Sequence, residues 1–339
     1  MNTARYRMLG SALAGSLLAL SVAQSANALD ADALRTQANN FFKPLPETMP
    51  GSENDSAEKV RLGEKLYFET ALSINGTQSC NSCHRVDGLK SGVDNEPTSP
   101  GALGKRGDRN SPGVWNAGFH IAQFWDGRAP DLKEQAKGPI LNPIEMGLPD
   151  ENTAINKLEQ AGYAQAFKAV YTTEEAPLTY ANVADAIAAF ERTLVTEDRF
   201  DRFLEGDDKA LTQVEQQGLQ DFIGSGCIAC HNGSLLGANS YQKMGMVNAY
   251  PNAQDLGRYA VTQQESDRFV FKVPSLRDIS RTAPYFHDGK AATLEQAVKD
   301  MAWYQLGQKL SDEKVQSITA FLKSLDNIRS IPAVASEEM

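Results

Sequence analysis

The stretch Cys80-Asn81-Ser82-Cys83-His84 has the form Cys-x-x-Cys-His, and this form returns as Cys227-Ile228-Ala229-Cys230-His231. In such a motif the two thiols add across the vinyl groups of a porphyrin, and the adjacent imidazole binds its iron. The two motifs use all four cysteines of the chain and two of its four histidines. The sequence therefore predicts two covalently bound haem c groups, with the irons held by His84 and His231.

Two other uses of paired cysteines fit this pattern less well. In a zinc ribbon the two cysteine pairs usually lie about 15–20 residues apart, whereas here they lie in different parts of the chain. Two ordinary disulfides would suit an exported protein. Neither alternative explains why a histidine follows each pair directly.

Residues 1–28 have the pattern of a secretory signal peptide. Arg5 and Arg7 precede an apolar stretch from Met8 to Ala23, and Ala26-Asn27-Ala28 supplies a small-x-small cleavage site. A retained N-terminal anchor is the alternative. Because c-type haem is attached outside the bacterial cytoplasmic membrane, export agrees with the haem motifs, and the sequence predicts a periplasmic protein without a membrane span after cleavage.

The net charge of −10 over 339 residues makes nucleic acid and anionic membranes poor partners. It suits a positively charged or small redox partner, although acidic surfaces also serve solubility alone. Apolar residues recur at helical spacing over 183–194 and over 315–325, where Ser311 is the expected N-cap. Strand patterns are scarce, and 268–273 is the best of them. The sequence predicts a mainly α protein with a long functional or mobile loop over 87–113.

The two halves resemble each other beyond the haem motifs. The stretch PGVWN at 112–116 matches PSLRD at 274–278, and FWDGR at 124–128 matches FHDGK at 286–290, at equal spacing. The second stretch leads into a capping box, Thr293 with Gln296. We expect two cytochrome-c-like helical domains related by internal duplication, residues 29–206 and 207–339, each holding one haem. Paired positions that differ between the halves are then the informative ones.

The remaining ligand of each iron separates electron transfer from chemistry. In the second half Met244, Met246 and Met301 are candidates, although Met301 shares a helical face with Leu294 and Val298 and equally suits a core position. In the first half no histidine or methionine lies between His84 and His120. The first iron is therefore expected to lack a strong sixth ligand.

At this point the chain resembles the bacterial di-haem cytochrome c peroxidase family. The resemblance rests on the two haem motifs and on stretches that span about residues 62–325: RNSP at 109–112, QFWDGR at 123–128, EQAKGP at 134–139, EMG at 145–147, PYFHDG at 284–289, and MA with QLG at 301–307. It implies a low-potential, peroxide-reacting haem on His84 and a high-potential, electron-accepting haem held by His231 and Met301.

The resemblance also implies roles for individual side chains. Trp125 matches the tryptophan between the haems, Glu145 the carboxylate beside the peroxide iron, and Gln135 a distal amide. One carboxylate suffices to move the proton when the O–O bond breaks. A calcium ion between the domains is implied on Asn110, Thr282 and Pro284, where amide and carbonyl oxygens suit a hard cation.

One departure from the family pattern concerns the loop after the first haem. Many members carry there a histidine that blocks the peroxide iron until the other haem is reduced, and this chain has Ala102 at the matching place. His120 is the nearby unassigned histidine, and we interpret it as a packing or surface residue. We therefore expect a peroxide site that is already open in the oxidised enzyme.

Together these observations predict a periplasmic peroxidase that reduces hydrogen peroxide with electrons from a small c-type cytochrome or cupredoxin, with a homodimer implied by the family. One alternative is a di-haem electron carrier. The other is a protein-modifying oxidase of the methylamine dehydrogenase maturation type. Those enzymes use a tyrosine where Met301 stands, and Tyr304 lies close to that place in sequence.

Overall fold

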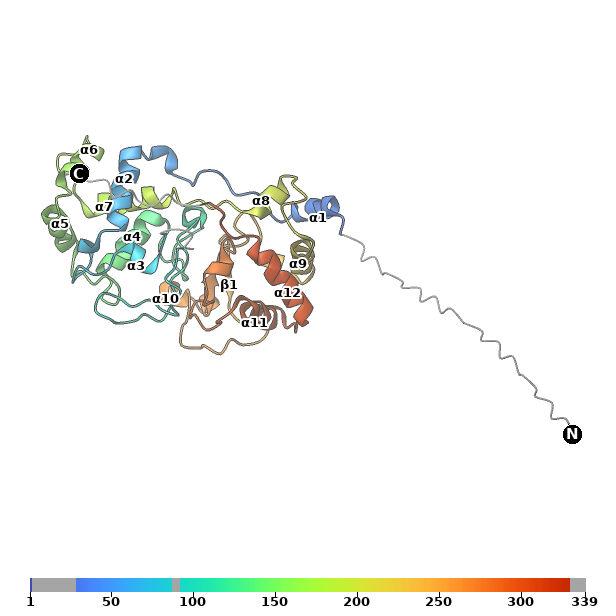
Figure 1. Ribbon diagram of the computed structural model, residues 1–339. Coiled ribbons are helices and arrows are strands. Elements are labelled where there is room, and N and C mark those ends of the chain that lie inside the picture. The colour runs from blue at the N-terminus through green and yellow to red at the C-terminus, as the bar shows by residue number, and fades with distance from the viewer. Residues whose placement is uncertain (2–28, 87–91, 330–339) are drawn as a thin grey trace.

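The computed structural model describes residues 29–86 and 92–329, together with Met1. The predicted signal peptide lies outside the described residues. Helices and long connections dominate, and two helical halves lie side by side, as Figure 1 shows. The helices are α1 (Ala31–Ala38), α2 (Ala57–Tyr67), α3 (Cys80–Cys83), α4 (Leu132–Leu141), α5 (Glu151–Gln160), α6 (Ala164–Val170), α7 (Tyr180–Glu191), α8 (Arg199–Leu204), α9 (Gln213–Gly224), α10 (Tyr259–Thr262), α11 (Leu294–Leu306) and α12 (Asp312–Lys323).

Strands are few, as the sequence predicts. Within the described residues, β1 (Tyr241–Lys243) pairs antiparallel with β2 (Val270–Lys272), and Tyr241 lies opposite Lys272. The mainly α fold class is confirmed by the helical architecture. The expected N-cap Ser311 begins α12 by accepting from the Lys314 amide.

The predicted capping box of α11 is only half formed. Thr293 accepts a hydrogen bond from the Gln296 amide, but the Gln296 side chain donates to Asp300 one helical turn further on. This correction follows from the i,i+4 geometry of the helix, which brings a charged acceptor within reach of the amide.

In the first half, α2 crosses α7 at close range. A Cβ built on Gly63 would lie 1.8 Å from the carbonyl oxygen of Ala186 and 3.0 Å from Cβ of Phe190. Only glycine permits this approach, because any side chain would collide with the backbone of the other helix. Ser56 and Thr179 cap the two helices by accepting backbone hydrogen bonds. The crossing closes the first hydrophobic core.

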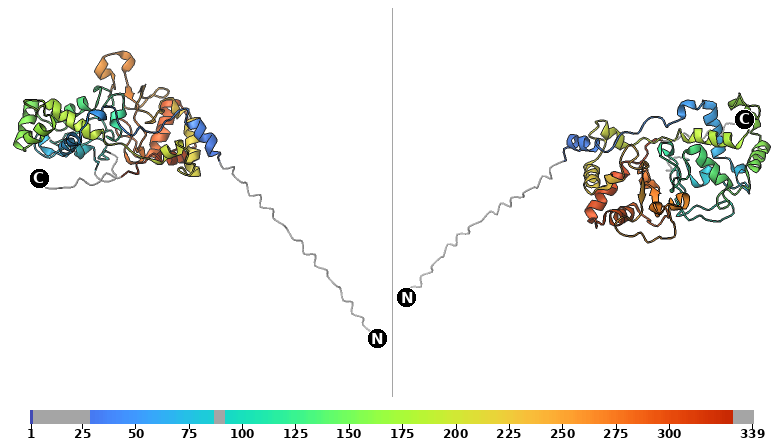
Figure 2. Two further views of the ribbon diagram at one scale, coloured as in Figure 1. Left: turned by 90° about the horizontal axis from the view of Figure 1, so that it is seen from above. Right: turned by 180° about the vertical axis from the view of Figure 1, so that it is seen from behind.

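The second half repeats this crossing with α9 and α12. A Cβ on Gly218 would lie 1.9 Å from the carbonyl oxygen of Ser317 and 2.8 Å from Cβ of Phe321. The core around it also contains side chains of α1 and α8, namely Leu34, Ala38, Phe200, Phe203 and Leu204. Both views of Figure 2 place α1 against this half. The predicted first-domain range 29–206 thus contributes two segments to the second core.

Backbone geometry supports the internal duplication. Positive φ angles occur at Asn116 (62°) and at its counterpart Asp278 (59°), and each precedes a single 3₁₀ turn, Ala117–Phe119 or Ile279–Arg281. Phe124 and Phe286 follow with φ of 66° and 72°. Helices α4 and α11 then begin at matching places. Left-handed backbone is uncommon outside glycine, so paired occurrences indicate one repeated design.

The two halves contact each other through reciprocal backbone hydrogen bonds. The Asn110 amide donates to the His287 carbonyl at 2.7 Å, and the Lys272 amide donates to the Trp125 carbonyl at 2.8 Å. In the duplicated alignment Asn110 is the counterpart of Lys272, and Trp125 is the counterpart of His287. The interface therefore has an approximate twofold relation.

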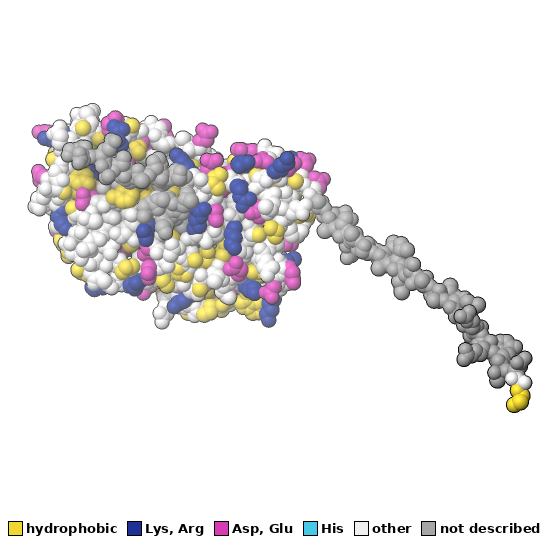
Figure 3. Space-filling model, in the orientation of Figure 1, with side chains coloured by type: hydrophobic (Ala, Val, Ile, Leu, Met, Phe, Trp, Pro, Cys, Tyr) yellow, Lys and Arg dark blue, Asp and Glu magenta, His cyan; other side chains and the backbone are white. Residues whose placement is uncertain are grey.

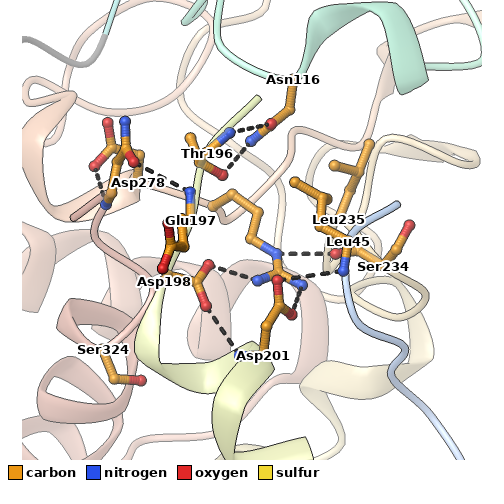
Figure 4. A network of polar contacts seen from close by, with 12 residues as sticks. Leu45, Asn116, Thr196, Glu197, Asp198, Asp201, Ser234, Leu235, Asp278 and Ser324 are labelled. Carbon is orange, nitrogen blue, oxygen red and sulfur yellow. Dashed lines mark hydrogen bonds and ion pairs between the residues drawn. The ribbon is translucent and has the colours of Figure 1, made fainter. Parts of the chain in front are cut away.

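A buried polar network strengthens the junction between the halves. Asn116 and Thr196 form two mutual hydrogen bonds of 2.8 and 2.9 Å, and Asp198 and Asp201 lie below them in Figure 4. Arg277, whose side chain is fully buried, forms ion pairs with both carboxylates at 2.5 and 2.6 Å. Because buried charges need complete pairing, this cluster fixes how the segment 196–201 meets the second half.

Candidate di-haem site

The first Cys-x-x-Cys-His motif forms the short helix α3, and His84 ends it. The Ser79 amide is satisfied by Oγ of Ser82 at 3.0 Å. His84 Nδ1 lies 3.0 Å from the Pro112 carbonyl oxygen. With a proton on Nδ1, the ring donates to this carbonyl, and Nε2 keeps its lone pair for a metal. Burial lowers the pKa of His84, which favours this neutral form.

The second motif is built in the same way on a 3₁₀ turn, Cys227–Ala229. His231 Nδ1 lies 3.0 Å from the Leu236 carbonyl oxygen, and burial lowers the pKa of this ring too. Each motif opens into its own cavity: Cys80, Cys83 and His84 line the first, and Cys227, Cys230 and His231 line the second. Two thiols and one free imidazole nitrogen per cavity are the donor set that covalent haem requires, so the residues fit the group.

The first cavity brings together the predicted peroxide-site residues. Glu145, Gln135 and Trp125 all line it with His84. Gln135 projects from α4, which Asp131 caps, and Glu145 follows the end of that helix. Burial raises the pKa of Glu145, against the opposing effects of the Arg128 charge and of a 3.0 Å hydrogen bond from Asn142. A carboxyl with a raised pKa is suited to hold and release a proton.

The loop that carries Ala102 packs against the backbone of Glu145. The Ala102 amide donates to the Glu145 carbonyl at 2.7 Å, and its own carbonyl accepts from Asn75 at 2.6 Å. A Cβ on Gly101 would lie 2.1 Å from the Ile144 carbonyl oxygen. The loop thus helps to fix the position of Glu145.

His120 does not lie in the first cavity. It lines the second, where its Nδ1 is 3.2 Å from Nζ of Lys272. This placement agrees with the interpretation of His120 as a packing residue rather than a ligand of the first iron.

In the second cavity the structure separates the methionine candidates. Met301 on α11 and Met244 both line the cavity with His231, while Met246 is exposed. Tyr304 lies outside this lining and packs its ring 5.1 Å from that of Tyr250. Met301 thus lines the second cavity with His231, and Tyr304 does not.

Trp125 lies where the two cavities meet, because it lines both. Its Nε1 donates to the Asn110 carbonyl at 2.9 Å, and its ring lies 6.4 Å from that of His287, edge to face. Its own carbonyl accepts from the second half, as described above. The indole is thus held from both sides.

The three predicted calcium ligands, Asn110, Thr282 and Pro284, all line the second cavity. The Asn110 amide nitrogen donates to the Glu96 carbonyl at 2.9 Å, which leaves Oδ1 available. No described residue donates a hydrogen bond to Oδ1 of Asn110 or to the carbonyls of Thr282 and Pro284. Three unused oxygens fit a hard cation.

Two residues of the first cavity were missed by sequence reasoning. Met146 is buried there within the hydrophobic core, and Glu191, at the end of α7, is 6% exposed with Oε2 unpartnered among the described residues. Burial raises the pKa of Glu191 to about 8, although Arg192 opposes this. The adjacency of Met146 to Glu145 was an available signal. For Glu191, the apolar spacing of α7 indicated only burial.

Two covalent haem sites on duplicated helical halves define a di-haem c-type protein. A family described as di-haem cytochrome c peroxidase matches residues 57–209. The chain is 45% identical over 303 residues to the cytochrome c551 peroxidase of Pseudomonas aeruginosa, covering 87% of each chain. It is 45% identical to that of Nitrosomonas europaea, covering 94% of this chain and 92% of the other. The chain belongs to the di-haem cytochrome c peroxidase family.

More distant relatives extend the comparison. The methylamine utilization protein MauG of Methylorubrum extorquens is 34% identical, covering 84% of this chain and 83% of its own. A solved MauG-like protein associated with microbial copper homeostasis superposes with a TM-score of 0.73 at 28% identity, covering 84% of this chain and 94% of the other. These findings confirm the predicted family and the predicted di-haem peroxidase class. Membership of this family implies two haem c groups.

No helix within residues 29–86 and 92–329 has the length and apolar character needed to cross a membrane. On the face shown in Figure 3, basic and acidic side chains are interspersed.

Proposed function

We propose that this protein is a periplasmic peroxidase that reduces hydrogen peroxide to two waters, taking two electrons from a small c-type cytochrome or cupredoxin and two protons from the buffered solvent. When bound, the haems supply the redox chemistry, with the His84 site reacting with peroxide and the His231/Met301 site receiving electrons. The observation that carries the proposal is the half-buried Glu145 carboxyl, which lines the same cavity as His84 and has a raised pKa.

Glu145 moves the proton in this proposal. The carboxylate accepts a proton from one peroxide oxygen and returns it to the other as the O–O bond breaks, so that the second oxygen leaves as water. Asn142 holds Oε1 of Glu145 at 3.0 Å and leaves Oε2 for the substrate. Gln135 lines the same cavity and orients the peroxide through its amide. Burial keeps the pKa of Glu145 raised, and this makes it easier for the carboxylate to take the proton from peroxide.

Trp125 positions the two sites for electron exchange. Its indole lines both cavities, donates to Asn110 of the first half and packs against His287 of the second, so the ring shortens the gaps through which an electron must tunnel. Met301 would hold the second iron through its sulfur, and such a ligand raises the reduction potential. Calcium on Asn110, Thr282 and Pro284 would tie Trp125 to the interface through the Asn110 carbonyl.

We further propose that the peroxide site is open in the oxidised enzyme. Ala102 cannot bind iron, and His120 lies on the second cavity instead of the first. The haem domains are proposed to be residues 29–206 and 207–339, and the protein a homodimer.

The deciding experiment is a peroxide-dependent progress curve with reduced cytochrome c, started from fully oxidised holoenzyme. Oxidation of the donor without a lag supports both the peroxidase and the open site. A lag that pre-reduction removes supports the peroxidase but rejects the open site. Met146, which lines the first cavity, would then be the candidate for the blocking ligand. No turnover with cytochrome or cupredoxin donors rejects the proposed function.

A further inference from the structure

At the positions that the duplication relates to two predicted calcium ligands, the chain has a lysine and a histidine. Asn110 is the counterpart of Lys272, and Thr282 is the counterpart of His120. All four residues line the second cavity, at the interface between the halves. The amides of Asn110 and Lys272 also make the reciprocal hydrogen bonds of that interface. Asn110 and Thr282 offer neutral oxygens to a cation, whereas Lys272 and His120 include a cation of their own, the Lys272 ammonium.

Lys272 is a buried ammonium without a carboxylate partner. The residue is 6% exposed, and among the described residues its Nζ forms no ion pair. Its polar contact is His120 Nδ1, at 3.2 Å. Burial lowers the pKa of Lys272 to about 8, so the ammonium form persists at neutral pH. A buried charge is costly unless an opposite charge and hydrogen bonds compensate it. An anion close to Nζ would compensate this charge.

His120 adds a hydrogen-bond donor beside this ammonium. Burial and the Lys272 charge hold the pKa of His120 well below its usual value, so the ring is neutral. Since Lys272 donates to Nδ1, the ring proton is on Nε2. Nε2 is buried and has no partner among the described residues. The pair thus presents an ammonium without an opposite charge and an N–H group without an acceptor among the described residues.

The fold indicates which anion completes the pair. Cys227 and Cys230 would hold the second porphyrin by its vinyl edge, so that its propionates would lie at the opposite edge. Trp125 marks the side on which the two cavities meet, and Lys272 is bonded to Trp125 through its backbone. We propose that Lys272, together with His120, binds a propionate of the haem attached at Cys227 and Cys230, as a built-in cation that duplicates the calcium site. This inference rests on the two haems of the proposed function but not on peroxidase activity.

The test measures reduction potentials in the holoprotein. An ammonium beside a propionate favours the reduced haem, which carries one positive charge fewer. Replacing Lys272 with Met should lower the equilibrium constant for reducing the high-potential haem at least tenfold, or 59 mV for one electron. Lys272→Arg keeps the charge and should stay within threefold of the wild type. Each potential is read from haem absorbance in a mediated redox titration.

Further measurements keep the outcomes distinct. Lys272→Gln, which retains a polar side chain, replaces the Met variant if that one does not fold, and the same tenfold fall is expected. The inference is overturned if a variant that holds two haems keeps its high potential, or if only the low potential shifts. Failure of the proposed function looks different, because a haemochrome spectrum of the wild type would then show fewer than two covalent haems, or peroxide turnover would be absent with both potentials normal.

Discussion

Replacing Glu191 with Gln should remove a loss of folding stability that ionisation of this buried carboxyl causes as pH rises. Glu191 ends α7, is buried beside the first cavity, and has an unpartnered oxygen among the described residues. Burial raises its pKa from 4.5 to about 8. The folded protein therefore binds this proton more tightly than the unfolded chain does. The associated stability is fully present below pH 4.5 and is lost as pH rises toward 8.

The size of this effect follows from the pKa difference. Each pH unit between the unfolded and folded values costs about 1.4 kcal/mol, so the loss between pH 4.5 and pH 7 is on the order of 3 kcal/mol. A glutamine side chain at this position cannot ionise, and the variant should therefore gain on the wild type by about that amount over this range. At pH 4 the two proteins should differ little.

The assay is urea unfolding of the holoprotein at pH 4, 5.5 and 7, followed by far-UV circular dichroism. Glu215→Gln is the matched control with the opposite sign. Burial alone would raise the pKa of Glu215, but hydrogen bonds from Arg199 and Thr212 hold it below its usual value. The stabilisation by the Glu215 carboxylate is lost as pH falls through that lowered pKa. The Glu215→Gln variant should therefore have a smaller free energy of unfolding than the wild type at pH 7. Parallel pH profiles for wild type and Glu191→Gln would refute the reasoning.

Three further predictions concern the site and the helix crossings. Glu145→Gln should slow the reaction with peroxide by about 10²–10⁴-fold at unchanged haem content, whereas exposed Glu134→Gln should not, in stopped-flow mixing. Gly218→Ala should destabilise the second half by about 1–3 kcal/mol in denaturant titrations, because its methyl group meets a backbone carbonyl; Gly224→Ala, with nothing within 4 Å, should not. Calcium chelation should lower the midpoint of thermal unfolding of the wild type and leave that of Asn110→Ala unchanged. An equal fall in both proteins would show that calcium binding does not depend on Asn110.

The sequence predicted those features that depend on local pattern. Helical spacing located α7 and α12, and short motifs located both imidazoles, because the chemistry of haem attachment is confined to five consecutive residues. The equal spacing of the FWDGR and FHDGK stretches revealed the duplication, which the paired positive φ angles of Phe124 and Phe286 support.

Features that depend on long-range packing were beyond sequence reasoning. The placement of α1 in the second core depends on contacts with α8 and α9, residues far along the chain. The partners of Lys272 and the burial of Glu191 depend likewise on how two halves meet. The side of the interface on which His120 lies could not follow from its own neighbours in sequence, and it took the structure to place it on the second cavity.

The position of α1 also bears on the order in which the protein is made. α1 is synthesised before α9, yet its apolar side chains pack against that helix, and the backbone amide of Gly233 donates to the carbonyl of Phe41 at 2.8 Å. Contacts between such distant segments form slowly, because a long loop must close first. α1 therefore cannot complete its packing until α9 and the later segments of the second core have been synthesised, so this core cannot form fully in a polypeptide that lacks them.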